Sequence, residues 1–497
     1  MVEVLTNNNI KDAVNLCCVN FIHAYEIYGD ISEWDVSRVT DMSELFKDKL
    51  YFNYDISNWD VSNVTNMESM FYKAKSFNHP LNNWNVSNVT NMESMFNEAK
   101  LFNQSINKWN VSNVTNMTSM FNYAVSFNQP IGNWNVSNVR NMTSMFNSAV
   151  SFNQPIGNWN VSNVRNMEFM FRNTYSFNQS LYNWNVSNVT NMYGMFYEAT
   201  LFNQDIACWD VSKVTNMKYM FYWAESFNQP INTEVIIKEN GDRYVAWDVL
   251  NVTNMKNMFE YAKVFNQDIS NWNVSNVTDM SRMFNEAKLF NQPIGNWNVS
   301  NVTNMKFMFR KADSFNQSLN NWIGVSNVRS MFGMFFMAHL FNQPLNNWDV
   351  SNVRDMRYMF LCAKSFNQPL NNWNVSNVTN MISMFGVAES FDQPLSNWNV
   401  SNVIDVKDIN EIFVEAKSFN QDLSSWKILS SNEKMLLHIS SEIKEFESEK
   451  ECSICLNSEV NDYIIRMNCC GNNYHKNCII KWLDLNKNCP ICRIQFD

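Results

Sequence analysis

Residues 81–104, LNNWNVSNVTNMESMFNEAKLFNQ, form a unit that recurs with small changes through most of the 497 residues. Its tryptophan is the clearest marker, because eight tryptophans from Trp34 to Trp209 follow one another in steps of 25 residues. Eight more continue the series to Trp426, with one longer step of 38 residues before Trp247. Self-similarity at a fixed period of roughly 20 to 50 residues is the signature of a repeat architecture. The sequence therefore predicts about 16 stacked coils over residues 31–428.

Two hydrophobic periods alternate within the quoted unit. The first apolar residues are spaced as in an extended segment, and the next are spaced as on one face of a short helix. These residues are Trp84, Val86 and Val89 for the first part, and Met92, Met95, Phe96 and Ala99 for the second. Thr90 and Glu93 stand where a capping box would begin that helix. Each coil is thus predicted to hold an extended segment, a helix of two or three turns and a second extended segment.

A single coil is too small to fold alone. About eight large apolar side chains at roughly 2 kcal/mol each contribute ~16 kcal/mol, whereas ordering 25 backbone units costs at least ~25 kcal/mol. Stacking adds hydrogen bonds between coils and a continuous core, so the predicted object is a solenoid. In a stack, the repeated Met and Phe residues are interpreted as core, and the repeated Asn residues as amide ladders; polar-ligand binding by the asparagines is the alternative.

The recurring pattern W-N/D-V-S-N-V-T-N-M-x-x-M-F-x-x-A-x-x-F-N-Q resembles the BspA-like, leucine-rich-repeat-related family of unknown function labelled DUF285. The resemblance covers about four fifths of the chain. It implies an α/β solenoid similar to leucine-rich repeats, right-handed, with 25-residue coils, short parallel strands and short helices. Such a shape usually serves recognition, but the resemblance names no ligand.

Three segments depart from the repeat. Near residues 232–246, apolar runs flank Asn240-Gly241, which predicts a β-hairpin that is either a partner contact or a tolerated insertion. Residues 1–30 carry apolar side chains near helical spacing and are predicted to be a helix that caps the first coil. Residues 429–449, with Ile439 and Ile443 among their apolar positions, are predicted to be an amphipathic connector helix.

Composition excludes several classes of function. The net charge of −10 and the absence of a basic stripe argue against nucleic-acid binding, which needs clustered Lys and Arg. No apolar stretch is long enough for a transmembrane helix, and residues 1–16 do not resemble a secretory signal. We therefore expect an intracellular protein that is not secreted and has no membrane partner. The N-x-S/T triplets are then part of the repeat rather than glycosylation sites.

Seven of the eleven cysteines lie in the last 46 residues. With one histidine they are spaced as paired metal ligands: Cys452 and Cys455, Cys469 and Cys470, His475 and Cys478, Cys489 and Cys492. Tetrahedral zinc is bound by such short-loop pairs of thiolates and imidazoles. A domain this small has too little core to fold alone, and structural zinc can supply on the order of 10 kcal/mol at each site. The spacing therefore predicts a zinc-dependent domain over residues 450–497.

In this order of ligands the segment resembles a RING finger. The cross-brace topology of that family implies two structural zinc ions with interleaved ligands. Carried over to this chain, the first zinc takes Cys452, Cys455, His475 and Cys478, and the second takes Cys469, Cys470, Cys489 and Cys492. One departure stands out, because the family usually separates its third and fourth ligands and often uses histidine where this chain has Asn472. Both adjacent cysteines can bind only if the chain bends sharply, for which Gly471 is suited; otherwise the second site has three ligands.

Further matches imply the activity of the family. Ile454, Trp482 and Pro490 stand where RING fingers dock a ubiquitin-conjugating enzyme, although Trp482 is also at helical spacing from Ile479 and suits simple packing. Arg493 matches the family's linchpin arginine, whose guanidinium can donate forked hydrogen bonds to the conjugating enzyme and to ubiquitin. The resemblance implies transfer without a covalent intermediate on this chain.

The sequence as a whole is interpreted as a RING-type ubiquitin-protein ligase whose solenoid selects substrates or host partners. The alternative is a non-catalytic interaction or surface protein in which zinc is only structural. The abundance of Asn, Ile, Lys, Phe and Tyr is typical of AT-rich genomes, and with a zinc domain of eukaryotic type it resembles proteins of giant viruses of protists. The substrate, the ubiquitin chain type and the oligomeric state are not predicted.

Overall fold

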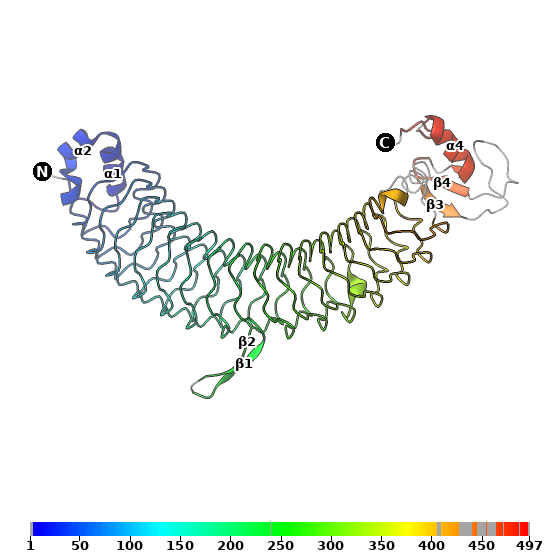
Figure 1. The fold of residues 1–497 in the computed structure, drawn as a ribbon. Coiled ribbons are helices and arrows are strands. Elements are labelled where there is room, and N and C mark those ends of the chain that lie inside the picture. The colour runs from blue at the N-terminus through cyan, green and yellow to red at the C-terminus, as the bar shows by residue number, and fades with distance from the viewer. Residues whose placement is uncertain are drawn as a thin grey trace.

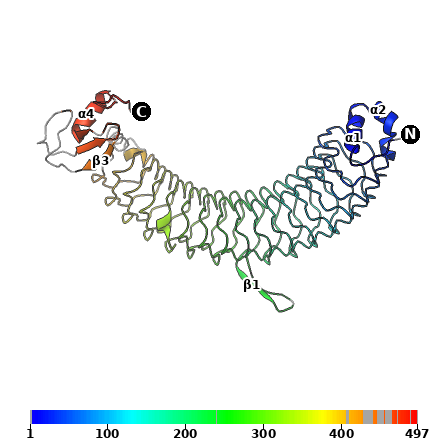
Figure 2. The same cartoon turned by 180° about the vertical axis from the view of Figure 1, so that it is seen from behind.

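Stacked coils form a curved array, with two short helices beside its first coil (Figures 1 and 2). The computed structural model describes residues 3–238, 240–404, 409–426, 440–444, 454, 464–470, 472–486 and 488–495. Helix α1 (Ile10–Val19) and helix α2 (Phe21–Tyr28) occupy the place of the single predicted capping helix. The helical conformation is interrupted between them at Asn20, whose side chain accepts a hydrogen bond from the His23 N–H and caps α2. Helix α1 buries Ile10, Ala13, Val14 and Cys17 in the core of the array.

Aromatic columns form the core along the array. Phe96 and Phe121 of neighbouring coils stack with ring centroids 5.7 Å apart, and Trp109 and Trp134 do so at 6.3 Å. The indole N–H of each core tryptophan is also satisfied, as where Trp109 Nε1 donates to the Leu81 carbonyl at 2.8 Å. Every coil therefore buries its large side chains against the same side chains of its neighbours, which is the stacking that a solenoid requires.

The helix predicted for each coil does not form among the described residues of the array. In the quoted coil the N–H groups of Ser94 and Phe96 donate to carbonyls of the next coil at 2.8 and 2.9 Å, whereas those of Met95 and Asn97 close tight turns within the coil. Ser94 has a positive φ of 54°, which a helix excludes. A zigzag of turns buries the same residues as a helix would, and the adjacent backbone offers hydrogen bonds that an isolated short helix lacks.

The predicted parallel strands are reduced to one-residue bridges. The bridges run in parallel register from coil to coil, for example Asn66 to Asn91 and Asn91 to Asn116. Thr90 extends this contact, because its N–H and its hydroxyl both donate to the Thr65 carbonyl, at 2.9 and 3.2 Å. Thr90 thus bonds to the preceding coil instead of capping a helix.

Asparagine amides form a ladder on one side of the coils. The N–H of Asn128 donates to Asn103 Oδ1 at 2.9 Å, and Asn128 Oδ1 in turn accepts from the N–H of Asn153 and from Gln154 Nε2, both at 2.9 Å. The same bonds recur from coil to coil, for example between Asn266 and Asn291. At these positions the asparagines hold neighbouring coils together, as the ladder interpretation predicts.

Replacing Asn128 by alanine is expected to lower the free energy of unfolding by about 2–4 kcal/mol, because two donors of the next coil lose their acceptor. Chemical denaturation followed by tryptophan fluorescence would measure this loss. Asn135→Ala is the matched control, since Asn135 Oδ1 accepts from the Ser137 N–H of its own exposed turn. We expect a loss of no more than about 1 kcal/mol there; equal losses for the two variants would contradict the ladder.

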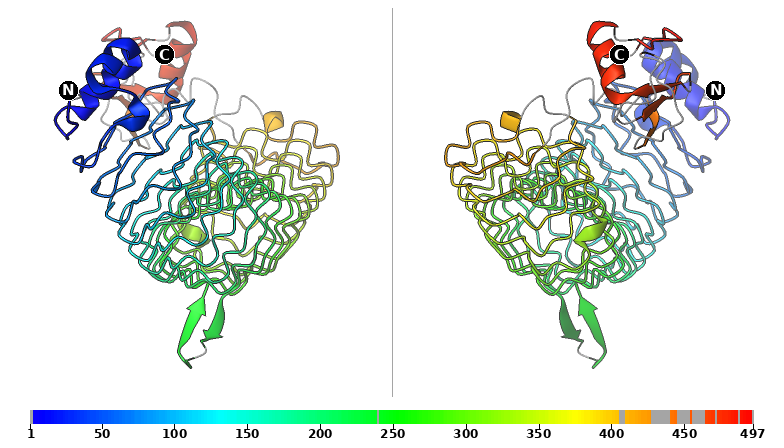
Figure 3. Two further views of the ribbon diagram at one scale, coloured as in Figure 1. Left: turned by 90° about the vertical axis from the view of Figure 1, so that its left-hand side faces the viewer. Right: turned by 90° about the vertical axis from the view of Figure 1, so that its right-hand side faces the viewer.

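The insertion before Trp247 is an antiparallel hairpin that projects from the outer side of the arc (Figures 1 and 3). Strand β1 (Glu234–Ile237) pairs with β2 (Arg243–Ala246), and Gly241 in the connecting turn has a φ of 85°. The Tyr244 hydroxyl donates to the Cys208 carbonyl at 2.5 Å, which fixes the base of the hairpin to the coil before it.

A small sheet and a helix follow the last coils. Strands β3 (Ser440–Lys444), β4 (Ile464–Met467) and β5 (Asn473–His475) form an antiparallel sheet in the order β3-β4-β5, and α4 (Lys476–Asn486) follows β5. The helix predicted over 429–449 is therefore wrong at residues 440–444; its other residues lie outside the described ones. Ile443 pairs with Ile465 of β4, and this pairing outweighs the helical spacing of a short apolar run. In the described part of the chain, no helix is long and apolar enough to cross a membrane.

Candidate metal centre

Four cysteine sulfurs converge beside the small sheet. Cys469 and Cys470 lie in the turn after β4, and Cys489 and Cys492 follow α4. All four Sγ atoms lie within 4.8 Å of one another, and those of Cys470 and Cys489 are 3.6 Å apart. Tetrahedral zinc with bonds of ~2.3 Å separates its sulfur ligands by about 3.8 Å. The donor set and its spacing therefore fit one zinc ion.

The turn after β4 brings both adjacent cysteines to this cluster. The Met467 N–H donates to the Asn472 carbonyl at 3.1 Å and closes the turn, so that Cys469 and Cys470 do not alternate as strand residues do. The Asn472 side chain donates to the Cys470 carbonyl at 3.4 Å and supports the same turn. Gly471, which we predicted to permit the bend, lies outside the described residues.

The protonation of the cysteines is coupled to this geometry. The pKa of the Cys469 thiol is raised, first by burial and then by the thiols of Cys492 and Cys489. The pKa of Cys492 is lowered, chiefly because the Ile494 N–H donates to its sulfur. A bound divalent cation favours the thiolate at every ligand and so offsets the cost of burying several of them together. The cluster is thus suited to a metal rather than to four free thiols.

Half of the other predicted ligand set is described. His475 ends β5 and is buried, and Cys478 lies in the first turn of α4, with its Sγ 4.0 Å from His475 Nδ1. Cys452 and Cys455 lie outside the described residues, so a second ion remains a prediction. His475 and Cys478 stand in the sequence between the two cysteine pairs of the cluster. The cluster therefore joins the cysteine pairs before and after His475 and Cys478 without including these two residues. This is the interleaving of ligand pairs that a cross-brace requires.

The predicted partner-binding residues lie on and around α4 and the loop that follows it. Arg493 is exposed and has its guanidinium carbon 5.5 Å from the ring centroid of Trp482. Trp482 Nε1 donates to the Asn488 carbonyl at 2.9 Å, which orients the indole under that arginine. Pro490 is partly buried, and Ile454 packs against the small core of the sheet and helix.

Exposed apolar residues that we did not predict lie on the same two segments. Leu485 of α4 is 84% exposed, and Ile491 and Ile494 beside Pro490 are 51% and 52% exposed. Their signal in the sequence is weak: Leu485 follows Trp482 by three residues, and Ile491 lies between two ligands. Exposed apolar side chains and an exposed arginine are typical of surfaces that bind proteins.

Comparison with known families covers most of the chain. The family described as "Mycoplasma protein of unknown function, DUF285" matches residues 15–131, 80–174, 153–241, 236–346 and 330–450. The chain belongs to the DUF285 family. This DUF285 protein also carries a match to "Ring finger domain" over residues 450–493, the segment that holds the cysteine cluster. The predicted repeats and the predicted RING domain are therefore both confirmed as families.

Curated relatives match the RING segment of this DUF285 protein. The "E3 ubiquitin-protein ligase Iruka" of Drosophila melanogaster is 46% identical over 43 residues, which cover 9% of this chain and 11% of the relative. "Alcohol-sensitive RING finger protein 1" of Eremothecium gossypii is 44% identical over 64 residues, covering 12% and 19%. Human "RING finger protein 141" is 40% identical over 53 residues, covering 11% and 21%. This chain thus spans about a fifth or less of these relatives.

One solved structure aligns with most of the chain, but with a low TM-score. The chain in the "TLR13-ssRNA13 complex" aligns over 79% of this DUF285 protein and 53% of its own length, with 10% identity and a TM-score of 0.17. A score that low does not establish a shared fold, so the leucine-rich-repeat-like geometry remains a prediction.

Proposed function

We propose that the protein is a RING-type E3 ubiquitin-protein ligase that recruits a ubiquitin-conjugating enzyme through its zinc domain and substrates through its coils. One observation carries the proposal. Arg493 directly follows the cysteine cluster and lies over Trp482, and Leu485 of the same helix and Ile491 of the same loop are exposed. A purely structural zinc module needs neither the exposed arginine nor the exposed apolar residues.

The proposed ligand sets are those of the cross-brace. The described cluster of Cys469, Cys470, Cys489 and Cys492 holds one zinc, and His475 and Cys478 hold another together with Cys452 and Cys455. When bound, each zinc supplies folding free energy, because four protein ligands fill its tetrahedral coordination.

Catalysis on this surface is by positioning. Ile454, Trp482 and Pro490 contact the conjugating enzyme, and the Arg493 guanidinium donates hydrogen bonds to that enzyme and to the ubiquitin it carries. Restricting the mobile ubiquitin in this way aligns the thioester for attack by a substrate lysine. No residue of this chain forms a covalent catalytic intermediate with ubiquitin.

The inner face of the arc supports a role in substrate recruitment. The turns equivalent to residues 93–98 line this face. In one of them the Ser383 N–H donates to the Glu411 carbonyl in η3 (Ile409–Glu411), which is the orange element at the inner edge in Figure 1. The stacking of the coils places the equivalent turns along the same edge. On the middle coils, half-buried aromatic residues replace the Ser, Asn and Glu of residues 93–98. They include Tyr193, Tyr197, Tyr222, Trp223, Phe307 and Phe332.

Cations accompany these rings. Lys218 lies 5.1 Å from the ring centroid of Tyr219, Arg282 lies 5.1 Å from that of Phe307, and Arg357 lies 4.9 Å from that of Phe332. Aromatic residues and arginine dominate the binding energy of protein interfaces. The middle of the inner face is therefore the part of the array best suited to hold a protein substrate.

Replacing Arg493 by alanine is expected to slow autoubiquitination about ten- to a hundredfold, because charge-assisted hydrogen bonds of roughly 1.5–3 kcal/mol are lost from the transition state. Arg493→Lys keeps the charge but not the fork, and we expect it to restore only part of the rate. The full-length protein would be assayed with a panel of conjugating enzymes. Arg466→Ala, at an exposed arginine of β4, is the matched control. Equal rates for all four proteins would favour a non-catalytic protein with structural zinc.

A further inference from the structure

Two pairs of arginines interrupt one column of threonines along the array. This column contains Thr90 and its equivalents, whose N–H groups donate from coil to coil. Arg140 and Arg165 replace threonine in two successive coils, and Arg329 and Arg354 do so again in two others. The N–H of Arg165 donates to the Arg140 carbonyl at 3.0 Å, and that of Arg354 to the Arg329 carbonyl at 2.9 Å. The backbone therefore fixes the two arginines of each pair one coil apart.

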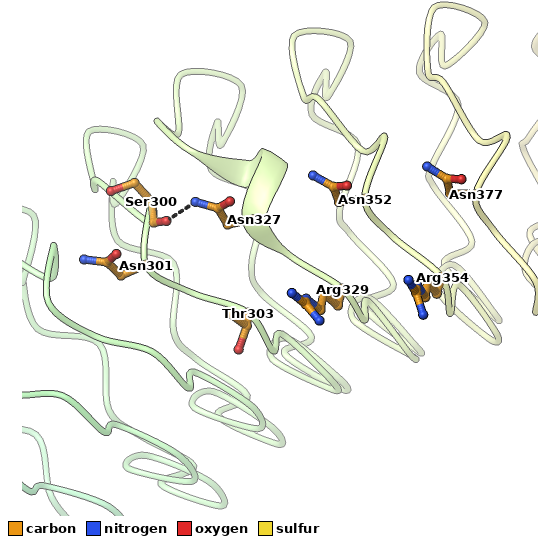
Figure 4. A pocket seen from close by; sticks show the side chains of 8 residues that line it. All are labelled: Ser300, Asn301, Thr303, Asn327, Arg329, Asn352, Arg354 and Asn377. Carbon is orange, nitrogen blue, oxygen red and sulfur yellow. Dashed lines mark hydrogen bonds between the residues drawn. The ribbon is translucent and has the colours of Figure 1, made fainter.

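Each pair borders an open cavity. Figure 4 shows Arg329 and Arg354 on neighbouring coils with both guanidinium groups on the same side. The cavity there is about 440 Å³, and the one at Arg140 and Arg165 is about 270 Å³. Asparagines two residues before each arginine line both cavities, and their amides are held by the preceding coil, as where Asn352 Nδ2 donates to the Ser326 carbonyl at 2.8 Å. The two cavities are thus built alike.

Neither pair has an acidic partner in the described part of the chain. No carboxylate lines either cavity, and none of the ion pairs of the described residues includes these four arginines. A lone arginine of the array is different: hydrogen bonds from Ser37 chiefly lower the pKa of the Asp35 carboxyl, and the charge of Arg38 lowers it further. The backbones of the two arginines of a pair lie about 5 Å apart, as those of neighbouring strands do. Their like charges, without a carboxylate between them, repel each other until an anion binds.

We propose that each arginine pair binds one phosphate monoester of a phosphorylated protein partner. A phosphate monoester has three terminal oxygens and a charge near −2 at about pH 7, which match two guanidinium forks. A carboxylate has two oxygens and one charge, so a single arginine satisfies it. The proposal deepens the proposed function, because a phosphorylated segment held here belongs to a substrate of the ligase.

The spacing of the pairs favours separate phosphates over a nucleic acid. Five coils with threonine in this column separate Arg165 from Arg329, so the two sites lie about 30 Å apart along the array. Nucleic acids present a phosphate every few ångströms and are bound by continuous rows of cations. The threonines between the pairs supply no such row.

The test is a ³¹P NMR titration of the full-length chain with phosphoserine blocked at both termini, in the absence of conjugating enzyme. We expect the wild-type chain to bind two molecules of phosphoserine. Each double variant, Arg329→Thr with Arg354→Thr or Arg140→Thr with Arg165→Thr, is expected to bind one. The variant in which all four arginines are replaced is expected to bind none. Threonine restores the residue of the neighbouring coils, so these variants are expected to fold. The Arg329→Lys, Arg354→Lys chain keeps the charge without the forks, and we expect about tenfold weaker binding at that site.

Three further measurements separate the sources of the anion. Blocked glutamate is expected to bind at least about tenfold more weakly than phosphoserine, and phosphoserine itself to bind more weakly below its second pKa of about 6. Arg38→Asn is expected to leave the stoichiometry at two. Unchanged stoichiometry in the threonine variants, or equal binding of glutamate, would overturn the proposal. So would tighter binding of duplex DNA that the same variants abolish, because it would assign the pairs to nucleic acid. Because no ubiquitin transfer is measured, the result is independent of the Arg493 test.

Discussion

Removing zinc, by chelation or by Cys489→Ser, is expected to unfold the C-terminal zinc domain and abolish the proposed ubiquitin transfer while the coils stay folded. The described core of this domain consists of Ile465, Met467, Tyr474, Ile479 and Leu483. Five buried side chains at roughly 2 kcal/mol each do not balance the entropy of ordering about 40 residues. A structural zinc contributes on the order of 10 kcal/mol of folding free energy at each site. Without this contribution the folded state of the domain is no longer favoured.

Hydrogen exchange would localise the effect. Amides of β4, β5 and α4 are expected to lose protection in the Cys489→Ser protein, whereas those of the coils keep it. Cys18→Ser is the matched control, because Cys18 is an exposed thiol of α1, outside the cluster. Retained protection in α4 after complete removal of zinc would show that the domain folds without the metal. That result would contradict the assignment of these cysteines as structural ligands.

The repeat was predictable from the sequence, but the local conformation of a coil was not. The 25-residue spacing of residues such as Trp84 and Trp109 predicted stacking and a shared core. The spacing of Met92, Met95 and Phe96 suits a helix and a zigzag of turns equally, because both bury the same side chains. What decides between them is the backbone of the next coil, whose carbonyls accept from every second N–H. Such long-range partners leave no trace in the period of one unit.

For the metal site, too, the ligands were predictable from the sequence but their geometry was not. Ligand spacing identified the cysteines, but whether Cys469 and Cys470 both face one ion depends on the turn after β4. Residues 440–444 show the same limit, since the apolar spacing of Ile443 does not reveal that a strand partner, Ile465, lies more than twenty residues away. The arginine pairs are visible in the sequence as substitutions in a column, but only the stacking places them side by side.

Replacing Phe121 by alanine is expected to cost about 3–5 kcal/mol and to divide the unfolding of the array into two steps. Phe121 is fully buried, with its ring 5.7 Å from those of Phe96 and Phe146 and 4.0 Å from that of Phe127. The substitution therefore removes contacts within one coil and across both of its interfaces. Each coil contacts only its neighbours, so a weakened interface uncouples the coils before it from those after it.

Chemical denaturation followed by tryptophan fluorescence, together with hydrogen exchange of peptides from each side of residue 121, would show whether the two parts unfold separately. Tyr123→Ala is the matched control, because Tyr123 belongs to the same coil but is 42% exposed. Its loss is expected to stay within about 1 kcal/mol and to leave a single transition, as is usual for surface substitutions. One shared transition in the Phe121→Ala protein would mean that coupling extends beyond nearest neighbours. The continuous Phe and Trp columns would then act as one unit, and stability would no longer be a sum over coils and their interfaces.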